Sequence, residues 1–199
     1  MEGSALADFL ARIDSQTTVL LDEAYTEYLA PEQRYDSIAL VRAHPNLVLA
    51  RTFSKAYGLA GLRVGYAVAQ PELAKRINAL RPRFNVNAPA QAAAIAALND
   101  RAFEQQTFAT NLAGRAKMEQ GFAALGLECM PSSANFLTVR FADARAMHQH
   151  LLGHGIHVAP LDIYGLPSWL RITVGTAGQI QKLLKFVAEW QPSVATGTP

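Results

Sequence analysis

Residues 51–66 read RTFSKAYGLAGLRVGY and follow a short apolar run from Leu47 to Ala50. This stretch holds three glycines and one lysine, Lys55, which lies between small and hydroxylic side chains. A partly buried lysine in such surroundings can act as a nucleophile toward a carbonyl group. The alternative is a strand end followed by a glycine-rich loop in which the lysine is simply exposed. The choice depends on what the rest of the chain places beside Lys55.

A second polar cluster follows another apolar run. Residues Thr17 to Leu21 are apolar and β-branched and lead directly into Asp22. This run and Leu47 to Ala50 both have the pattern of strands buried on both faces. In open α/β sheets the ligand crevice lies outside the carboxyl ends of the strands. Asp22 and Lys55 are therefore expected to face one crevice.

Helical and strand patterns alternate along the whole chain, which predicts an α/β protein. The expected strands are 17–21, 47–50, 64–69, 135–141, 156–158 and 170–174, and the expected helices are 4–13, 36–43, 71–80, 89–98, 103–125, 144–153 and 178–190. The two helices between residues 89 and 125 are expected to lead into a smaller domain. This predicts a first domain at 1–88, a second at 89–190 and a disordered tail at 191–199.

The composition limits the classes of function. The 199 residues carry a net charge of +2 without a run of five like charges, so no nucleic-acid or polybasic membrane surface is expected. The longest uncharged segment, residues 84–99, is too polar to span a membrane. The single cysteine, Cys129, excludes an internal disulfide and a multi-cysteine metal site, and it suits a reducing compartment. A cytoplasmic protein without a metal site is expected.

Lysine and aspartate at one crevice have a specific chemical use. A lysine that forms an imine with an aldehyde cofactor needs a carboxylate nearby if that cofactor contains a pyridine ring, because the carboxylate keeps the ring nitrogen protonated. Pyridoxal phosphate (PLP) is such a cofactor, and its phosphate needs several donors. The same loop offers the hydroxyls of Thr52 and Ser54 and the guanidinium of Arg63. The alternatives are turn-forming hydroxyls and a surface arginine.

Three motifs carry a resemblance to a known family. They are DEAYTEY at 22–28, the stretch at 51–66, and LRITVGT at 170–176. In this order they resemble histidinol-phosphate aminotransferase, a class II aminotransferase among the fold type I PLP enzymes, over nearly all of residues 4–190. The resemblance implies part of a large, mostly parallel-sheet PLP-binding domain followed by a small C-terminal α/β domain. It also implies a homodimer in the full-length family.

The resemblance also implies roles for individual residues. Lys55 would be the Schiff-base lysine and later move a proton, Asp22 would pair with the ring nitrogen, and Tyr25 would donate to the ring's phenolic oxygen. The phosphate would be bound by Thr52, Ser54 and Arg63. Arg171 would bind the anionic end of the substrate. From the residues alone, Arg171 on an alternating strand is expected to form a structural salt bridge.

Two departures from the family affect the substrate and the fold. Where many members have an arginine before the YGLP turn, this chain has Ala159. Losing one charge-assisted contact to a substrate phosphate costs about 1.5 to 3 kcal/mol, or roughly ten- to a hundredfold in affinity. The family's enzymes also have about as much chain again before the helix at Ser4. The large-domain sheet is therefore expected to lack several strands and to expose an apolar edge.

The implied reaction is transfer of an amino group between an amine or amino acid and a 2-oxo acid. Histidinol phosphate with glutamate and 2-oxoglutarate, in histidine biosynthesis, is the expected substrate set. An aromatic aminotransferase and a PLP-dependent phospho-amino-acid decarboxylase use the same residues and remain open. A third alternative is a truncated remnant that is inactive or folds only with a partner.

Overall fold

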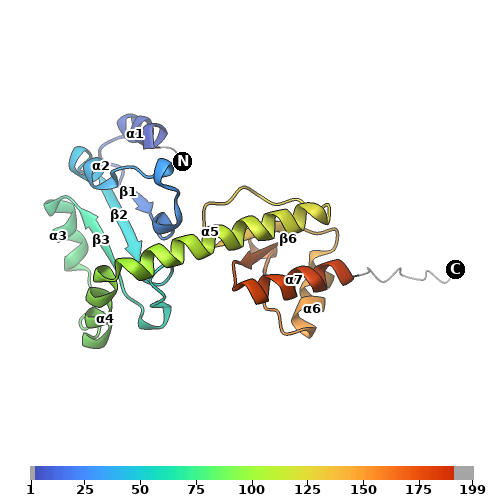
Figure 1. The fold of residues 1–199 in the computed structure, drawn as a ribbon. Coiled ribbons are helices and arrows are strands. Elements are labelled where there is room, and N and C mark those ends of the chain that lie inside the picture. Colours follow the sequence, from blue (N-terminus) through green and yellow to red (C-terminus); the bar gives the residue numbers. More distant parts are fainter. Residues whose placement is uncertain (1–2, 191–199) are drawn as a thin grey trace. The chain divides into compact units, whose positions relative to one another are not determined.

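The structure is a computed structural model that describes residues 3–190, and these form two compact units, one up to Phe108 and one from Ala109. Both units contain helices and strands (Figure 1). The first unit contains α1 (Gly3–Arg12), β1 (Val19–Asp22), α2 (Ser37–Ala43), β2 (Leu47–Thr52), β3 (Gly65–Ala69), α3 (Pro71–Ala79) and α4 (Ala88–Asn99). Helix α5 (Arg101–Ala124) starts in the first unit and ends in the second, which continues with β4 (Phe136–Arg140), α6 (Ala144–Gly153), β5 (Ala159–Leu161), β6 (Leu166–Thr173) and α7 (Ala177–Glu189). The division expected after residue 88 falls at the start of α4, within the first unit. The tail predicted at 191–199 lies outside the described residues.

Side-chain caps explain where several helices begin. The carboxylate of Asp36 accepts the Ala39 N–H at 2.9 Å at the start of α2, and Asn87 accepts the Ala90 N–H at 2.8 Å at the start of α4. Such caps satisfy backbone donors that have no partner within the helix. The helices are confirmed to within a few residues of their expected bounds.

The sheet of the first unit has the order β1-β2-β3. Strand β1 runs parallel to β2, with Asp22 opposite Ala50, and β3 runs antiparallel to β2, with Gly65 opposite Thr52. Helices α1 and α2 supply apolar side chains that pack with this sheet; the buried members are Leu6, Leu10, Val41, Leu47 and Leu49. Because β1 and β2 are parallel, their carboxyl ends lie at the same edge of the sheet.

Both outer strands of this sheet are open. Within residues 3–190, β1 pairs only with β2, and β3 also pairs only with β2. Leu20 in β1 is 66% exposed, and Tyr66 in β3 is 40% exposed. Strands of α/β sheets are normally covered on both faces. Within residues 3–190 the outer edges of β1 and β3 are therefore unpaired, and apolar side chains of both strands are exposed.

The second unit has an antiparallel sheet of order β4-β6-β5. The strand predicted at 156–158 is wrong, because β5 occupies Ala159–Leu161 instead. Strand β5 contains Pro160 and lies at the edge of the sheet, a position in which proline is found in strands. Strand β6 likewise begins at Leu166, before the expected residue 170.

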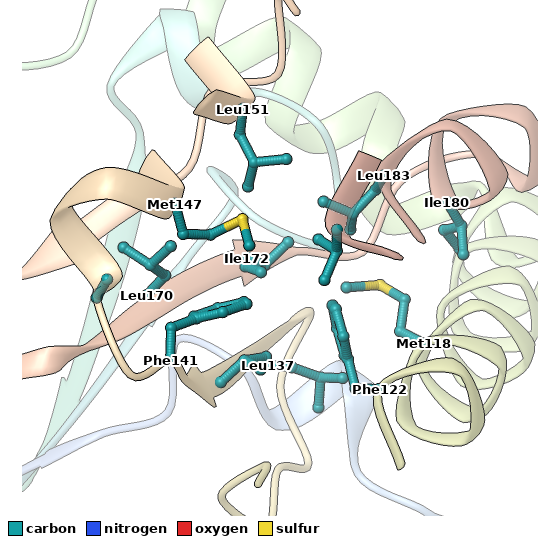
Figure 2. Packing of buried hydrophobic residues seen from close by; sticks show 13 residues of the cluster. Met118, Phe122, Leu137, Phe141, Met147, Leu151, Leu170, Ile172, Ile180 and Leu183 are labelled. Atoms are coloured by element: carbon teal, nitrogen blue, oxygen red, sulfur yellow. The ribbon is translucent and has the colours of Figure 1, made fainter. Parts of the chain in front are cut away.

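The second unit has its own apolar core. Figure 2 shows side chains from α5, α6, α7 and the sheet meeting there; the labelled members are Met118, Phe122, Leu137, Phe141, Met147, Leu151, Leu170, Ile172, Ile180 and Leu183. Leu151 is fully buried, whereas the next residue, Leu152, is 37% exposed.

Among residues 3–190, none of the helices combines the length and apolar character that a membrane span requires.

Replacing Leu151 with alanine is expected to lower the free energy of unfolding of the second unit by about 2 to 5 kcal/mol, because the removed side chain leaves a cavity in a packed core. Leu152→Ala is the matched control on the same helix and should cost about 1 kcal/mol or less. Urea unfolding followed by circular dichroism measures both. Equal losses for the two variants would contradict the observed packing.

Candidate functional site

The carboxyl ends of β1 and β2 bring three of the predicted residues to one edge of the sheet. Asp22 ends β1, and its Oδ1 accepts the Ala24 N–H at 3.0 Å, which turns the chain directly after the strand. Lys55 follows the end of β2, and its Nζ lies 5.6 Å from the centroid of the Tyr25 ring. Asp22, Tyr25 and Lys55 therefore lie in the neighbourhood that the sequence predicted.

Lys55 is exposed in this structure rather than partly buried. Its ammonium group faces an aromatic ring, an arrangement that stabilises a cation by about 0.5 to 1 kcal/mol at exposed sites. The amine is thus oriented by Tyr25 and accessible to a ligand from solvent.

The three predicted phosphate-binding residues form one cluster. The hydroxyl of Thr52 accepts the Ser54 N–H at 3.1 Å, and Nη1 of Arg63 donates to the Ser54 hydroxyl at 3.4 Å. The same Nη1 donates to the Ala60 carbonyl at 3.0 Å. Two hydroxyls and a guanidinium at this spacing can bind an anion with several charge-assisted hydrogen bonds.

The loop that holds this cluster is fixed by its own backbone. The Phe53 N–H donates to the Val64 carbonyl at 3.2 Å, and the Leu59 N–H donates to the Phe53 carbonyl at 2.9 Å. A side chain at Gly65 would place its Cβ 2.7 Å from the Arg51 carbonyl oxygen, so only glycine lets β3 lie this close to β2. Arg63 has φ of 51°, a left-handed conformation that costs free energy for a non-glycine residue. The loop positions Arg63 despite this cost.

The structure adds a buried ion pair that the sequence reasoning missed. Glu23 is 8% exposed and accepts from Arg51, whose Nη2 lies 2.8 Å from its Oε2. Burial alone would lower the pKa of Arg51, but hydrogen bonds to Tyr66 and Glu23 raise it. The sequence places Glu23 next to Asp22 and Arg51 next to Thr52, and these opposite charges could have suggested an ion pair. Only the parallel register of β1 and β2 shows that the two side chains meet.

A second group of ionisable side chains lies near the lysine loop. Oε2 of Glu27 is buried without a hydrogen-bond partner, and burial raises the pKa of this carboxyl. Burial, followed by the negative charges of Glu27 and Glu104, raises the pKa of Tyr57 to about 12. Tyr57 therefore stays protonated at neutral pH.

Arg171 lies in the second unit, on β6, and is exposed. Its cross-strand neighbours are Thr138 on β4 and Ala159 on β5, and its guanidinium carbon lies 5.4 Å from the centroid of the Phe136 ring. Among the described residues it forms no ion pair, so the structural salt bridge expected from the strand pattern is wrong. Its charge is available to an anionic ligand.

Relatives of known name support the motif assignment. A histidinol-phosphate aminotransferase 2 of Ralstonia nicotianae is 55% identical over 179 residues, which cover 88% of this chain and 48% of that protein. A histidinol-phosphate aminotransferase 1 of Cupriavidus pinatubonensis is 53% identical and is covered over 47% of its length. The chain thus spans about half the length of these relatives.

Solved structures agree with the fold. The histidinol-phosphate aminotransferase of Sinorhizobium meliloti, crystallised in complex with pyridoxal-5'-phosphate, superposes with a TM-score of 0.88 at 32% identity over 95% of this chain and 52% of that one. A putative histidinol-phosphate aminotransferase of Erwinia carotovora atroseptica superposes with a TM-score of 0.86 at 27% identity. The fold type I α/β architecture is confirmed. Residues 4–187 match the family "Aminotransferase class I and II", and this chain belongs to that family.

Proposed function

We propose that this chain forms the lysine-bearing part of a PLP-dependent aminotransferase. The observation that supports this most directly is the convergence of Asp22, Tyr25, Lys55 and the Thr52, Ser54 and Arg63 cluster at one sheet edge. The relatives of Ralstonia nicotianae, Cupriavidus pinatubonensis and Thiobacillus denitrificans are named histidinol-phosphate aminotransferases, which supports the same activity.

The residues present fit PLP. A dianionic phosphate needs several donors, and the cluster supplies two hydroxyls and the exposed guanidinium of Arg63, which no carboxylate pairs within residues 3–190. An aldehyde needs an accessible amine, and Lys55 is exposed. A pyridine nitrogen needs a carboxylate, and Asp22 is exposed at the same edge with one oxygen held by the Ala24 N–H.

When bound, PLP supplies an aldehyde carbon and a pyridine ring that accepts the electron pair released at the substrate's Cα. Lys55 would bond to that carbon and, once displaced by the substrate amine, move the proton from Cα. Asp22 would keep the ring nitrogen protonated, and the Tyr25 hydroxyl would donate to the phenolic oxygen. Arg171 would bind the substrate's anionic group.

We further propose that the donor is histidinol phosphate, with glutamate and 2-oxoglutarate as the partner pair in histidine biosynthesis. In the full-length protein we expect a cytoplasmic homodimer. We expect the open edges of β1 and β3 to be covered in the full-length protein by residues that correspond to the part of the relatives outside the matched region.

The donor assignment is tested with the PLP-loaded protein and a panel of histidinol phosphate, aromatic amino acids and phosphothreonine, each with 2-oxoglutarate, by mass spectrometry of the products. Transfer from histidinol phosphate at the highest kcat/KM is expected. Faster transfer from aromatic amino acids would reassign the substrate, and carbon dioxide release from phosphothreonine would identify a decarboxylase. No product from any donor would contradict an active enzyme.

Ala159 gives a sharper test of the phosphate end. Because it lies directly opposite Arg171, Ala159→Arg would place a second guanidinium beside the first. The KM for histidinol phosphate should fall roughly ten- to a hundredfold, while that for an unphosphorylated donor should stay unchanged. Ala142→Arg adds the same charge at an exposed site of the second unit and is the control. Equal effects of both variants would refute the assignment of this subsite.

A further inference from the structure

A buried polar network joins β1, β2 and α2. The carboxylate oxygen Oε2 of Glu23 accepts from Nε and Nη2 of Arg51 at 3.0 and 2.8 Å. The hydroxyl of Ser37 donates to the same oxygen at 3.1 Å and accepts from Nη2 of Arg51 at 3.1 Å. Ser37 is 1% exposed and Glu23 is 8% exposed, whereas the Arg51 side chain is 26% exposed, so the carboxylate end of the network is the buried part. Glu23, Arg51 and Ser37 each contact the other two, and Tyr35 and Tyr66 add hydrogen bonds to Glu23 and Arg51 respectively.

The network lies at the positions where the two strands lead into the site. Glu23 directly follows Asp22, and its N–H donates to the Ala50 carbonyl at 2.9 Å, which continues the parallel ladder by one step. Arg51 directly precedes Thr52 at the end of β2. The ion pair thus links the two strands next to the residues that lead into the candidate site.

The alternation of side chains along a strand separates the ion pair from the site. Successive side chains point to opposite faces of a sheet, so Glu23 and Arg51 lie on the face opposite to Asp22 and Thr52. Ser37, at the start of α2, contacts the pair on this opposite face. Glu23 and Arg51 therefore point away from a ligand held by Asp22 and Thr52, and they would act on it through those two residues.

Stability alone is a weak reason for such a pair. Replacing a buried ion pair by apolar side chains of similar volume is often neutral or stabilising, whereas removing one partner leaves an uncompensated charge. The directional hydrogen bonds do fix how the two strand ends lie relative to each other, which apolar contacts do less strictly.

We infer that Glu23 and Arg51 are positioning residues that hold Asp22 at a fixed place relative to the loop of Thr52, Ser54 and Lys55. The expected effect on PLP binding rests on the proposed function, in which Asp22 and the loop of Thr52, Ser54 and Lys55 would both contact PLP. At metal sites, outer contacts that orient the coordinating residues change metal affinity or activity by about ten- to a hundredfold, and we expect an effect at the lower end of that range here.

The decisive variant is the double replacement Glu23→Met with Arg51→Met, which removes both charges together. It should melt within a few degrees of the unmodified protein, yet bind PLP about tenfold more weakly, as measured by titration of the cofactor's absorbance. Glu23→Gln alone should lose both stability and affinity. The control is the exposed pair Glu128 and Arg140 of the second unit, replaced in the same way. PLP affinity of the double variant within twofold of the unmodified protein would overturn the inference.

A second readout does not depend on PLP. The Ala24 N–H is held by Asp22 and the Ser54 N–H by Thr52, so both report on the strand ends in the unliganded protein. Their hydrogen exchange should become at least about tenfold faster in the double variant and stay unchanged in the Glu128 and Arg140 control. Unchanged exchange would refute positioning.

If the unmodified protein binds no PLP, the proposed function fails, and the exchange rates still decide the inference. If the double variant does not fold, Arg51→Lys, which keeps the charge but loses the Nε contact, is tested by the same two measurements.

Discussion

Replacing Lys55 with alanine is expected to abolish covalent attachment of PLP and to lower amino-group transfer by about a thousandfold or more. The variant loses both the amine that bonds to the cofactor and the base that moves the Cα proton, and positioned proton transfer alone contributes about 10² to 10⁴ in rate. Since Lys55 is exposed and oriented by the Tyr25 ring, its removal should leave the fold intact. Cofactor absorbance and product formation measure the two effects.

Lys75→Ala is the matched control, because Lys75 is an exposed lysine on α3 of the same unit. It should keep both the absorbance of bound PLP and the rate. If the Lys55 variant behaved like this control, the covalent and catalytic roles of Lys55 would both be wrong.

Asp22→Asn is expected to lower kcat by about 10² to 10⁴ while weakening PLP binding far less. The amide oxygen of asparagine can still accept the Ala24 N–H that now bonds to Oδ1 of Asp22, so the turn after β1 should be kept. What the variant lacks is the negative charge that favours protonation of a nearby ring nitrogen. Single-turnover rates and a PLP titration separate the two quantities.

The position of the charge is checked with Asp22→Glu, which retains a carboxylate on a longer side chain. This variant should keep more activity than Asp22→Asn. Equal loss in both variants would show that the shape of the site, rather than the charge of Asp22, determines the rate.

The sequence predicts most of the fold because the apolar runs and breaks are local. Leu47 to Ala50 and the run into Asp22 appear as neighbouring strands, and Asn87 with Pro89 marks the start of α4. The strand predicted at 156–158 lies instead at Ala159–Leu161, because pairing with β6, and not the local apolar pattern, determines which residues form it. That is a property of the assembled sheet and not of the local sequence.

In the predicted site, too, local sequence patterns give the positions of some residues, and the assembled sheet determines the contacts of others. Asp22 and Lys55 lie at the same edge of the sheet, as expected, because each follows an apolar run that forms a strand. The pairing of Glu23 and Arg51 could not be predicted, because a charged residue in a sequence says nothing of its partner, and their contact depends on the parallel register of β1 and β2. A salt bridge was expected for Arg171, but none forms among the described residues, because a polar position on an alternating strand does not specify a partner.

The central claim is that Lys55 is the residue to which PLP attaches. The most direct measurement is to incubate the protein with PLP, reduce it with borohydride, digest it and locate the added mass by tandem mass spectrometry. We expect one modified residue, Lys55, with Lys75 and the other lysines unmodified at stoichiometric PLP. Modification spread over several lysines, or none at Lys55, would contradict the account.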